Sequence, residues 1–328
     1  DLPSNSLNQR AVIFFRTVSP YFDGAYSEGL ELGLYDTLTV GDYLVYRDKN
    51  GLWHDVDNSG TGIEGTVYCL LEMANGDIII GGNYINAGGI AEADYLCKWT
   101  GTAIEAITGA TFNNNVSAFA KDAKGNVYIG GTFTDVGDAN GDGIVKWDGN
   151  ITFSSLGTGI ADGRFAQAIA IDPTTGYIYI GGNFDSVGGV ADTKRIAYYD
   201  GSAWHALASG LNNTVYSLIF SPDGNLYIGG NFTDADGANG DYICRWDGLA
   251  FHMLGDVELS SIAAELVFDK NGNLYATGQF LNAGNDSNAD YFAVFKNNSW
   301  HALGTGLKGI GTEIVIIPVF HKNRKVDE

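Results

Sequence analysis

A six-bladed β-propeller with four-stranded blades is the fold that this sequence predicts, and three observations predict it. A glycine pair, one further residue and an aromatic recur at spacings of 49, 51, 48 and 48 residues. The composition favours strands and tight turns, with 46 Gly, 18 Tyr and 17 Phe. Glycine-containing turns divide each repeat into short segments. We expect the last blade to be closed by both termini, and five or seven blades are the alternatives.

The repeat motif has five copies in the 328 residues. In four copies both glycines are present, and in the fifth a threonine replaces the first glycine. Because the second strand of a blade lies near the crowded centre, a side chain at these positions would collide with the neighbouring blade. The copies begin at Gly81, Gly130, Gly181, Gly229 and Thr277.

Each repeat divides into four short strands. In the third repeat we expect strands at Gln167–Ile171, Tyr177–Gly181, Arg195–Tyr199 and Trp204–Leu207. The first and last pairs of strands are joined by turns that contain glycine, which adopts positive φ at no steric cost. Four strands in about 48 residues match one propeller blade.

The two ends of the chain resemble the parts of a sixth repeat. Tyr43–His54 matches the outer strands of a blade, and Thr312–Phe320 matches an innermost strand. A blade built from both ends would leave no exposed sheet edge. We therefore expect an N-terminal strand segment or small appendage at 1–40, a propeller at 41–320 and a tail at 321–328.

The charge of the chain excludes some partners. Its 39 acidic and 18 basic residues give a formal net charge of −21. Nucleic acid is not expected as a partner, because phosphate contacts need clustered Lys and Arg. Membrane insertion is not expected either, since apolar runs such as Ile314–Phe320 are far shorter than the roughly 20 residues that span a bilayer.

Three motifs carry a resemblance to known repeat families. They are Ile228–Phe232, Arg245–Gly248 and Trp300–Gly306, and they resemble the GGxF, WDG and W-x-x-LG-x-G motifs of propellers in secreted and virion proteins. Such repeats are similar to those of fungal cortical polarity markers, secreted bacterial surface proteins and bacteriophage tail-associated proteins. A shorter segment, Asp23–Leu30 followed by Leu38–Asp42, resembles a strand-turn pattern of distal tail proteins.

The resemblance implies an interaction module located in a virion or outside the cell. Its expected partners are other virion or surface proteins and host glycans. We predict a non-catalytic structural or host-surface-binding component of a phage tail. A secreted bacterial adhesin or matrix propeller is one alternative, and a propeller hydrolase that cleaves sugars or lactones is another.

The predicted binding face consists of the loops that join the second and third strands. These loops are rich in aspartate, so the face would suit cations, basic protein surfaces or polar sugars. Alternatively, the aspartates cap turns and keep the loops soluble. The candidate binding residues are Asp94, Asp138, Asp142, Asp192, Asp236, Asp241 and Asp290.

No catalytic residue, metal site or cofactor is predicted. Asp138–Gly143 fits the first half of a calcium loop, but the twelfth position is Gly149, which cannot supply the bidentate carboxylate. Four of the five histidines follow an aromatic at equivalent repeat positions, so they cannot converge on one metal. The sequence contains no nucleophile elbow, zinc-binding helix or phosphate-binding loop. We therefore do not expect an enzyme.

Overall fold

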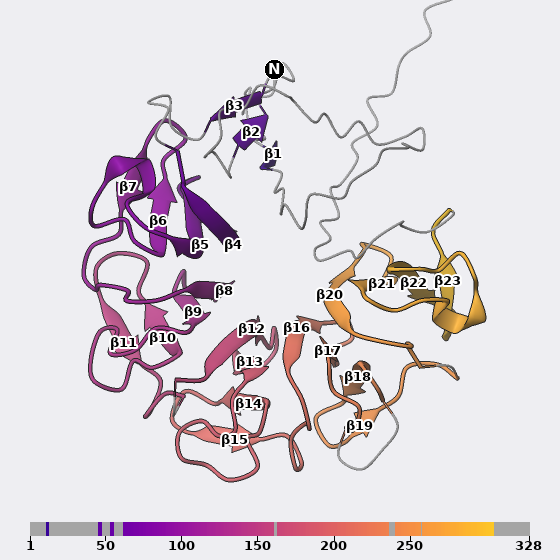
Figure 1. The fold of residues 1–328 in the computed structure, drawn as a ribbon. Helices are drawn as coiled ribbons and strands as arrows, with labels where there is room; N and C mark the ends of the chain where they lie inside the picture. Colours follow the sequence, from indigo (N-terminus) through magenta and orange to yellow (C-terminus); the bar gives the residue numbers. More distant parts are fainter. Residues whose placement is uncertain are drawn as a thin grey trace, which may run out of the picture. The chain divides into compact units, whose positions relative to one another are not determined.

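The structure is a computed structural model that describes residues 11–12, 45–47, 53–55, 62–160, 163–235, 240–256 and 258–304. Within these residues the regular structure is β-strand, apart from two short 3-10 turns, η1 (Ala87–Gly89) and η2 (Ala283–Asn285). The predicted all-β class is confirmed (Figure 1).

Each of the five repeats forms one sheet of four strands in chain order. The first contains β4 (Gly65–Glu72), β5 (Ile78–Tyr84), β6 (Leu96–Trp99) and β7 (Ile104–Ala106). The second contains β8 (Val116–Lys121), β9 (Val127–Gly131), β10 (Ile144–Trp147) and β11 (Phe153–Ser155). The third contains β12 (Phe165–Ile171), β13 (Ile178–Asn183), β14 (Ile196–Tyr199) and β15 (Trp204–Ala206). The fourth contains β16 (Val215–Phe220), β17 (Leu226–Gly230), β18 (Ile243–Trp246) and β19 (Phe251–His252). The fifth contains β20 (Ala263–Phe268), β21 (Leu274–Gly278), β22 (Phe292–Lys296) and β23 (Ser299–Ala302).

A sixth sheet of four strands was expected, but the described residues contain five four-stranded sheets and one three-stranded sheet. In the latter, β1 (Ala11–Val12) pairs with β2 (Val45–Arg47), which pairs with β3 (Trp53–Asp55). The β2–β3 hairpin overlaps the segment Tyr43–His54 predicted to form outer strands and ends one residue beyond it, at Asp55. The predicted innermost strand at 312–320 and the tail at 321–328 lie outside the described residues, as does most of 1–40.

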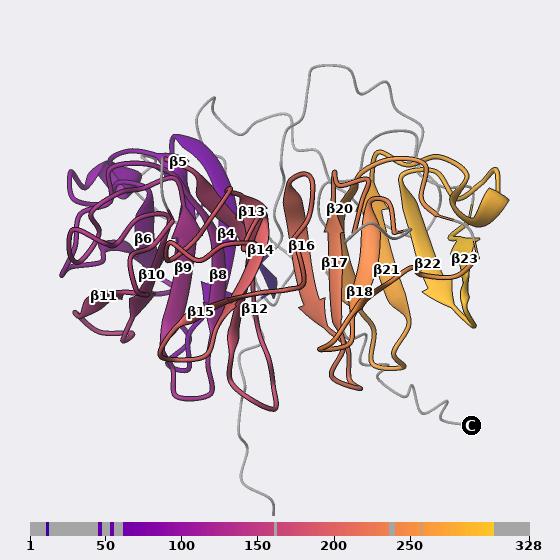
Figure 2. The same cartoon turned by 90° about the horizontal axis from the view of Figure 1, so that it is seen from below.

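The chain forms two compact units. One comprises Asp1–Ile171, Phe184–Val190 and Tyr199–Trp204, and the other comprises the remaining residues. Within the first unit, β8 lies between β4 and β12 (Figure 1). Within the second unit, β16 lies between β13 and β20, and β17 also contacts β20 (Figures 1 and 2). In each unit, therefore, the first strands of successive sheets pack together.

The glycine motif is explained by this packing. A Cβ at Gly81 would lie 2.6 Å from Cγ1 of Val116 on the next sheet, and one at Gly181 would lie 2.3 Å from Cγ1 of Val215. The aromatic side chain of each motif is almost completely buried. Phe133, for example, is 1% exposed and Phe232 is 0% exposed. The glycines thus permit close approach of neighbouring sheets, and the aromatics fill the space beside them.

Candidate functional site

The predicted binding face is built from loops that close on themselves. In three sheets an aspartate at the end of the second-to-third loop accepts a hydrogen bond from a backbone N–H at its start. The pairs are Asn86 N to Asp94 Oδ1 (2.7 Å), Asp135 N to Asp142 Oδ1 (2.9 Å) and Asn282 N to Asp290 Oδ1 (2.8 Å). These three candidates therefore fit the turn-capping interpretation.

Asp138 also stabilises its own loop. Its Oδ1 accepts from Asn140 N at 2.8 Å and its Oδ2 accepts from Ser155 Oγ at 3.0 Å. These bonds, led by the one from Asn140, lower the pKa of the Asp138 carboxyl. Asp286 in the fifth sheet makes the equivalent bond to Asn288 N at 3.0 Å. In the part of the chain that the structure describes, no three His, Cys, Asp or Glu side chains are grouped so that they could hold a metal.

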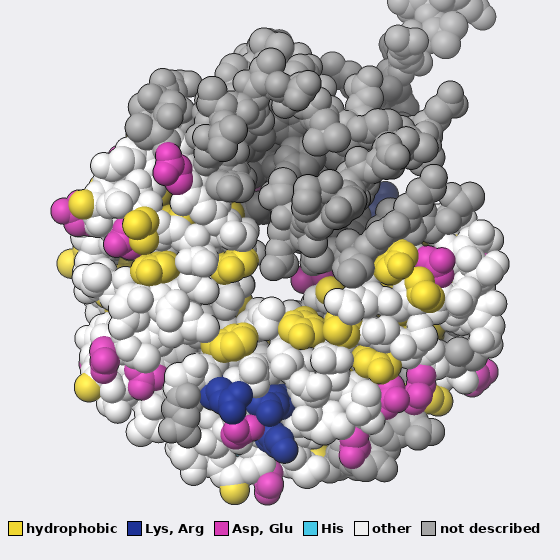
Figure 3. Space-filling model, viewed as in Figure 1, with side chains coloured by type: hydrophobic (Ala, Val, Ile, Leu, Met, Phe, Trp, Pro, Cys, Tyr) yellow, Lys and Arg dark blue, Asp and Glu magenta, His cyan; other side chains and the backbone are white. Residues whose placement is uncertain are grey.

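The remaining candidates are Asp192, Asp236 and Asp241. Burial raises the pKa of Asp241, and the nearby carboxylates of Glu258 and Asp234 raise it further. Asp192 is exposed and has a φ of 60°. Asp236 lies outside the described residues. In Figure 3, one acidic side chain on the face shown lies directly beside basic side chains. The hydrogen bonds of Asp94, Asp142 and Asp290 thus show a loop-closing role, and the binding role of the seven aspartates stays a prediction.

The same loops are attached to the segments that enter their sheets. Asn113 Nδ2 donates to Thr134 Oγ1 at 2.9 Å, and Thr134 N donates back to Asn113 Oδ1 at 3.0 Å. Asn212 and Thr233 repeat this pair of bonds at 3.1 and 2.9 Å. In the fifth sheet a serine takes the place of the asparagine. In the second and fifth sheets the loop is therefore held at two points, so its backbone is ordered before any partner binds.

Two exposed apolar residues on these loops were missed by the sequence analysis. Ile85 is 55% exposed and Leu281 is 43% exposed, and both directly follow the buried aromatic of the repeat. The other three repeats have a polar residue there: Thr134, Asp185 and Thr233. Comparing the repeats position by position would have identified them, because solvent-facing loop positions gain nothing structural from an apolar side chain.

A groove lies in the first unit and is lined by residues of the first two repeats. It has a volume of about 480 Å³. Its walls come from the β4–β5 turn, the end of β7 and the β10–β11 turn. Its lining includes Met73, Asp77, Lys98, Ile107 and Ile151.

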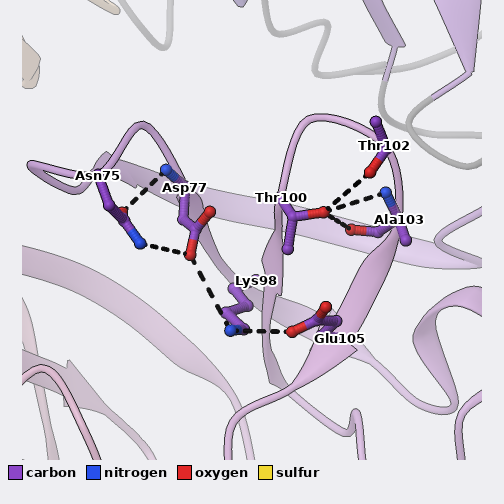
Figure 4. Close-up of polar contacts among 7 residues, drawn as sticks. All are labelled: Asn75, Asp77, Lys98, Thr100, Thr102, Ala103 and Glu105. Carbon is purple, nitrogen blue, oxygen red and sulfur yellow. Dashed lines mark hydrogen bonds and ion pairs between the residues drawn. The ribbon is translucent and has the colours of Figure 1, made fainter.

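The polar side of this groove is an ordered network (Figure 4). Lys98 Nζ lies 2.9 Å from Glu105 Oε2 and 3.9 Å from Asp77 Oδ2. Asn75 orients Asp77 by donating from Nδ2 to Oδ2 at 2.9 Å and by accepting from its backbone N at 3.1 Å. One cation thus stands between two carboxylates, so the network carries a formal charge of −1.

Two cysteines and one glutamate of the described residues take part in the packing of the sheets. Burial raises the pKa of the Cys97 thiol to about 12, so the reactive thiolate is not populated near neutral pH. Burial also raises the pKa of Cys244. Glu265, one of the inner-strand acids, accepts from Ser217 Oγ at 3.2 Å, and that hydroxyl accepts from Leu266 N. This contact joins two neighbouring first strands.

Comparison with known proteins supports the fold. No family model matches the chain, and no curated protein matches it. A GH74 enzyme from Niastella koreensis is similar in structure, with 16% identity, a TM-score of 0.51 and coverage of 80% of this chain and 42% of that one. The extracellular domain of a hybrid two-component system from B. thetaiotaomicron has 15% identity, a TM-score of 0.50 and coverage of 77% and 30%. The fold is of the β-propeller type.

These propellers have diverse roles, so the similarity carries no function. A streptogramin B lyase also matches, at 15% identity and a TM-score of 0.47. This chain spans less than half the length of the GH74 enzyme and of the two-component extracellular domain. Where the structure describes the chain, no helix is long and apolar enough to cross a bilayer.

Proposed function

We propose that this chain is a non-catalytic binding module that presents its second-to-third loops to a protein partner. One observation carries the proposal: in the second and fifth sheets a loop carboxylate closes the loop, and the loop is attached to the segment that enters the sheet. A backbone that is ordered before binding loses little entropy on association. Exposed apolar side chains such as Ile85 and Leu281 then supply the contact area.

We further propose that the protein works outside the cell or on a virion. The sequence resemblance to phage tail-associated and secreted arrays supports this location. The similarity to an extracellular domain is compatible with it and adds only the fold. A sixth blade closed by strands from both termini belongs to the same proposal, because a closed ring would hold the loops of all blades on one rigid frame.

Loop-face variants test the proposed function. Ile85→Asp and Leu281→Asp place a charge at an exposed position and should not affect folding. The full chain is biotinylated and used to capture proteins from the particle and envelope fractions of the source culture, and the Kd is then measured with the purified partner. We expect at least one of the two variants to weaken binding tenfold or more.

The matched control is Leu249→Asp, since Leu249 is 88% exposed on an outer hairpin away from these loops. This variant should bind as the unaltered chain does. A glycan array and hydrolysis assays on sugars and lactones run in parallel. Binding to sugars without any protein partner, or release of a hydrolysis product, would overturn the proposal.

A further inference from the structure

The five repeats provide an internal control for what the fold needs at each position. Where one repeat departs from its sisters in a side chain or in the length of a turn and its four-stranded sheet still forms, the departure is not needed to form that sheet. Rules broken without a structural gain are expected at functional sites. Several such departures meet at the groove in the first unit.

The first departure is Met73, at the start of the β4–β5 turn. The other four repeats have an oxygen-bearing side chain there: Asp122, Asp172, Ser221 and Asp269. Asp122 Oδ1, for example, accepts from the backbone N of Lys124 and of Asn126, both at 2.9 Å. Met73 cannot cap the turn, yet the backbone bond from Met73 N to Asp77 O (2.8 Å) matches the sister bond from Asp122 N to Asn126 O (2.9 Å).

The second departure is Asp77. Three sister repeats have asparagine at this position, and Asn126 Nδ2 donates to the capping Asp122 at 2.7 Å. Without a capping carboxylate at position 73, Asp77 instead faces Lys98. The replacement places a carboxylate on the groove wall, where Asn75 and Lys98 contact it.

The third departure is the β10–β11 turn on the opposite wall. It closes through Asp148 N to Thr152 O, whereas the third and fourth sheets close one residue sooner, through Asp200 N to Ala203 O and Asp247 N to Ala250 O. The longer turn carries Ile151, which is 57% exposed.

The connection after β7 is altered to accommodate this longer turn. A Cβ at Gly109 would lie only 2.0 Å from Ile151 O, and Gly109 has a φ of 106°. In the next three repeats the left-handed residue stands one position earlier, at Gly157, Ala208 and Gly255. Four changes in three separate segments therefore meet at one groove.

The chemistry of the groove selects its ligand. Met73, Ile107 and Ile151 provide an apolar wall, and methionine adapts to side chains of different shapes. Opposite them, the Lys98 network has a net negative charge and would attract a cation. The groove also includes Ala106 at the end of β7, which is an edge strand of its sheet and can pair with an added strand.

We infer that this groove binds an extended peptide segment of a partner protein, in which an apolar side chain stands beside a lysine or arginine. The apolar side chain packs against Met73 and Ile151, and the basic side chain pairs with Asp77. The exposed Glu105 does not line the groove, but it contacts Lys98 of the groove wall and adds negative charge there. This site goes beyond the proposed function, because it uses hairpin turns and an edge strand in place of the second-to-third loops.

The test uses the full chain and a library of capped hexapeptides composed of Leu, Val, Lys, Glu and Ser. We expect the retained peptides to combine an apolar residue with lysine. The double variant Met73→Asp with Asp77→Asn converts the first turn to the sister arrangement. It should keep or raise the thermal midpoint while weakening peptide binding at least tenfold. Ile151→Ser should weaken binding similarly, and its matched control Leu249→Ser should not.

Three outcomes would overturn the inference. They are retention of no peptide, selection of glutamate-rich peptides, and binding that the double variant leaves unchanged. Cellotetraose serves as the sugar probe. If the chain binds cellotetraose and no peptide, and the double variant loses the sugar binding, the inference is also overturned. Ile85→Asp should leave peptide affinity unaltered, so failure at this groove is distinguishable from failure of the loop-face function.

Discussion

Tyr95 has a backbone conformation that tyrosine rarely adopts, with a φ of 61°. It stands just before the third strand, where Gly143 has a φ of 67° in the next repeat. At both positions the residue exchanges hydrogen bonds with the end of the second strand, as in Tyr95 N to Tyr84 O at 2.9 Å. The Tyr95 side chain packs against the core that includes Ile79 and Phe112. Packing thus offsets a local backbone cost of about 1–2 kcal/mol.

This balance predicts an unusual order of stability. Tyr95→Ala keeps the backbone cost and removes the packing, so it should destabilise the fold by about 2–3 kcal/mol. Tyr95→Gly loses the same packing but removes the backbone cost, so it should be about 1 kcal/mol more stable than the alanine variant. Urea unfolding measures both. At Tyr128, which lies inside β9, glycine should instead be the less stable replacement, and the same order at both positions would contradict this account.

At the scale of elements, the loops of the binding face are ordered by side-chain bonds from outside the loop. The Asn113–Thr134 pair shows this most directly, because two bonds join residues 21 positions apart. Loops held in this way resist local opening. Their order is therefore a property of the contact between two segments and not of the loop sequence alone.

Asn113→Ala should release the β9–β10 loop without unfolding its sheet. We expect a loss of about 1–2 kcal/mol for the two bonds. Hydrogen exchange should become faster at the amides of 134–142 and stay unchanged in β9. Asn114→Ala is the control, since its side chain bonds only the next residue, Asn115. Equal exchange in both variants would show that the pair does not order the loop.

At the scale of the whole molecule, stability depends on whether the predicted sixth blade forms. Propeller blades contact only their neighbours, so the loss of one strand is felt mainly where it pairs. Deletion of residues 308–328 would remove the strand predicted at 312–320. We expect the thermal midpoint to fall by about 5–10 °C. A midpoint that does not change on deletion would contradict closure by the C-terminal segment, and calorimetry makes the measurement.

The repeat motif, the strands and most turns could be predicted from the sequence, because they depend on local periodicity and on glycine. The predicted strands of the third repeat match β12 to β15 within two residues at each end. For the predicted binding residues, the sequence indicated the loops but not the hydrogen-bond partners. Asp94, Asp142 and Asp290 lie on the expected loops, but hydrogen-bond partners seven or eight positions away commit them to loop closure.

The amino-acid order by itself determined an all-β repeat protein with four strands per repeat. Only the tertiary structure decided which side chains remain available for binding. Ile85 is exposed and Phe133 is buried, although both are apolar residues near the same loops. The groove beside Met73 likewise exists only because two turns and a connection from different parts of the chain come together. Availability depends on neighbours in space, and periodicity along the chain does not specify them.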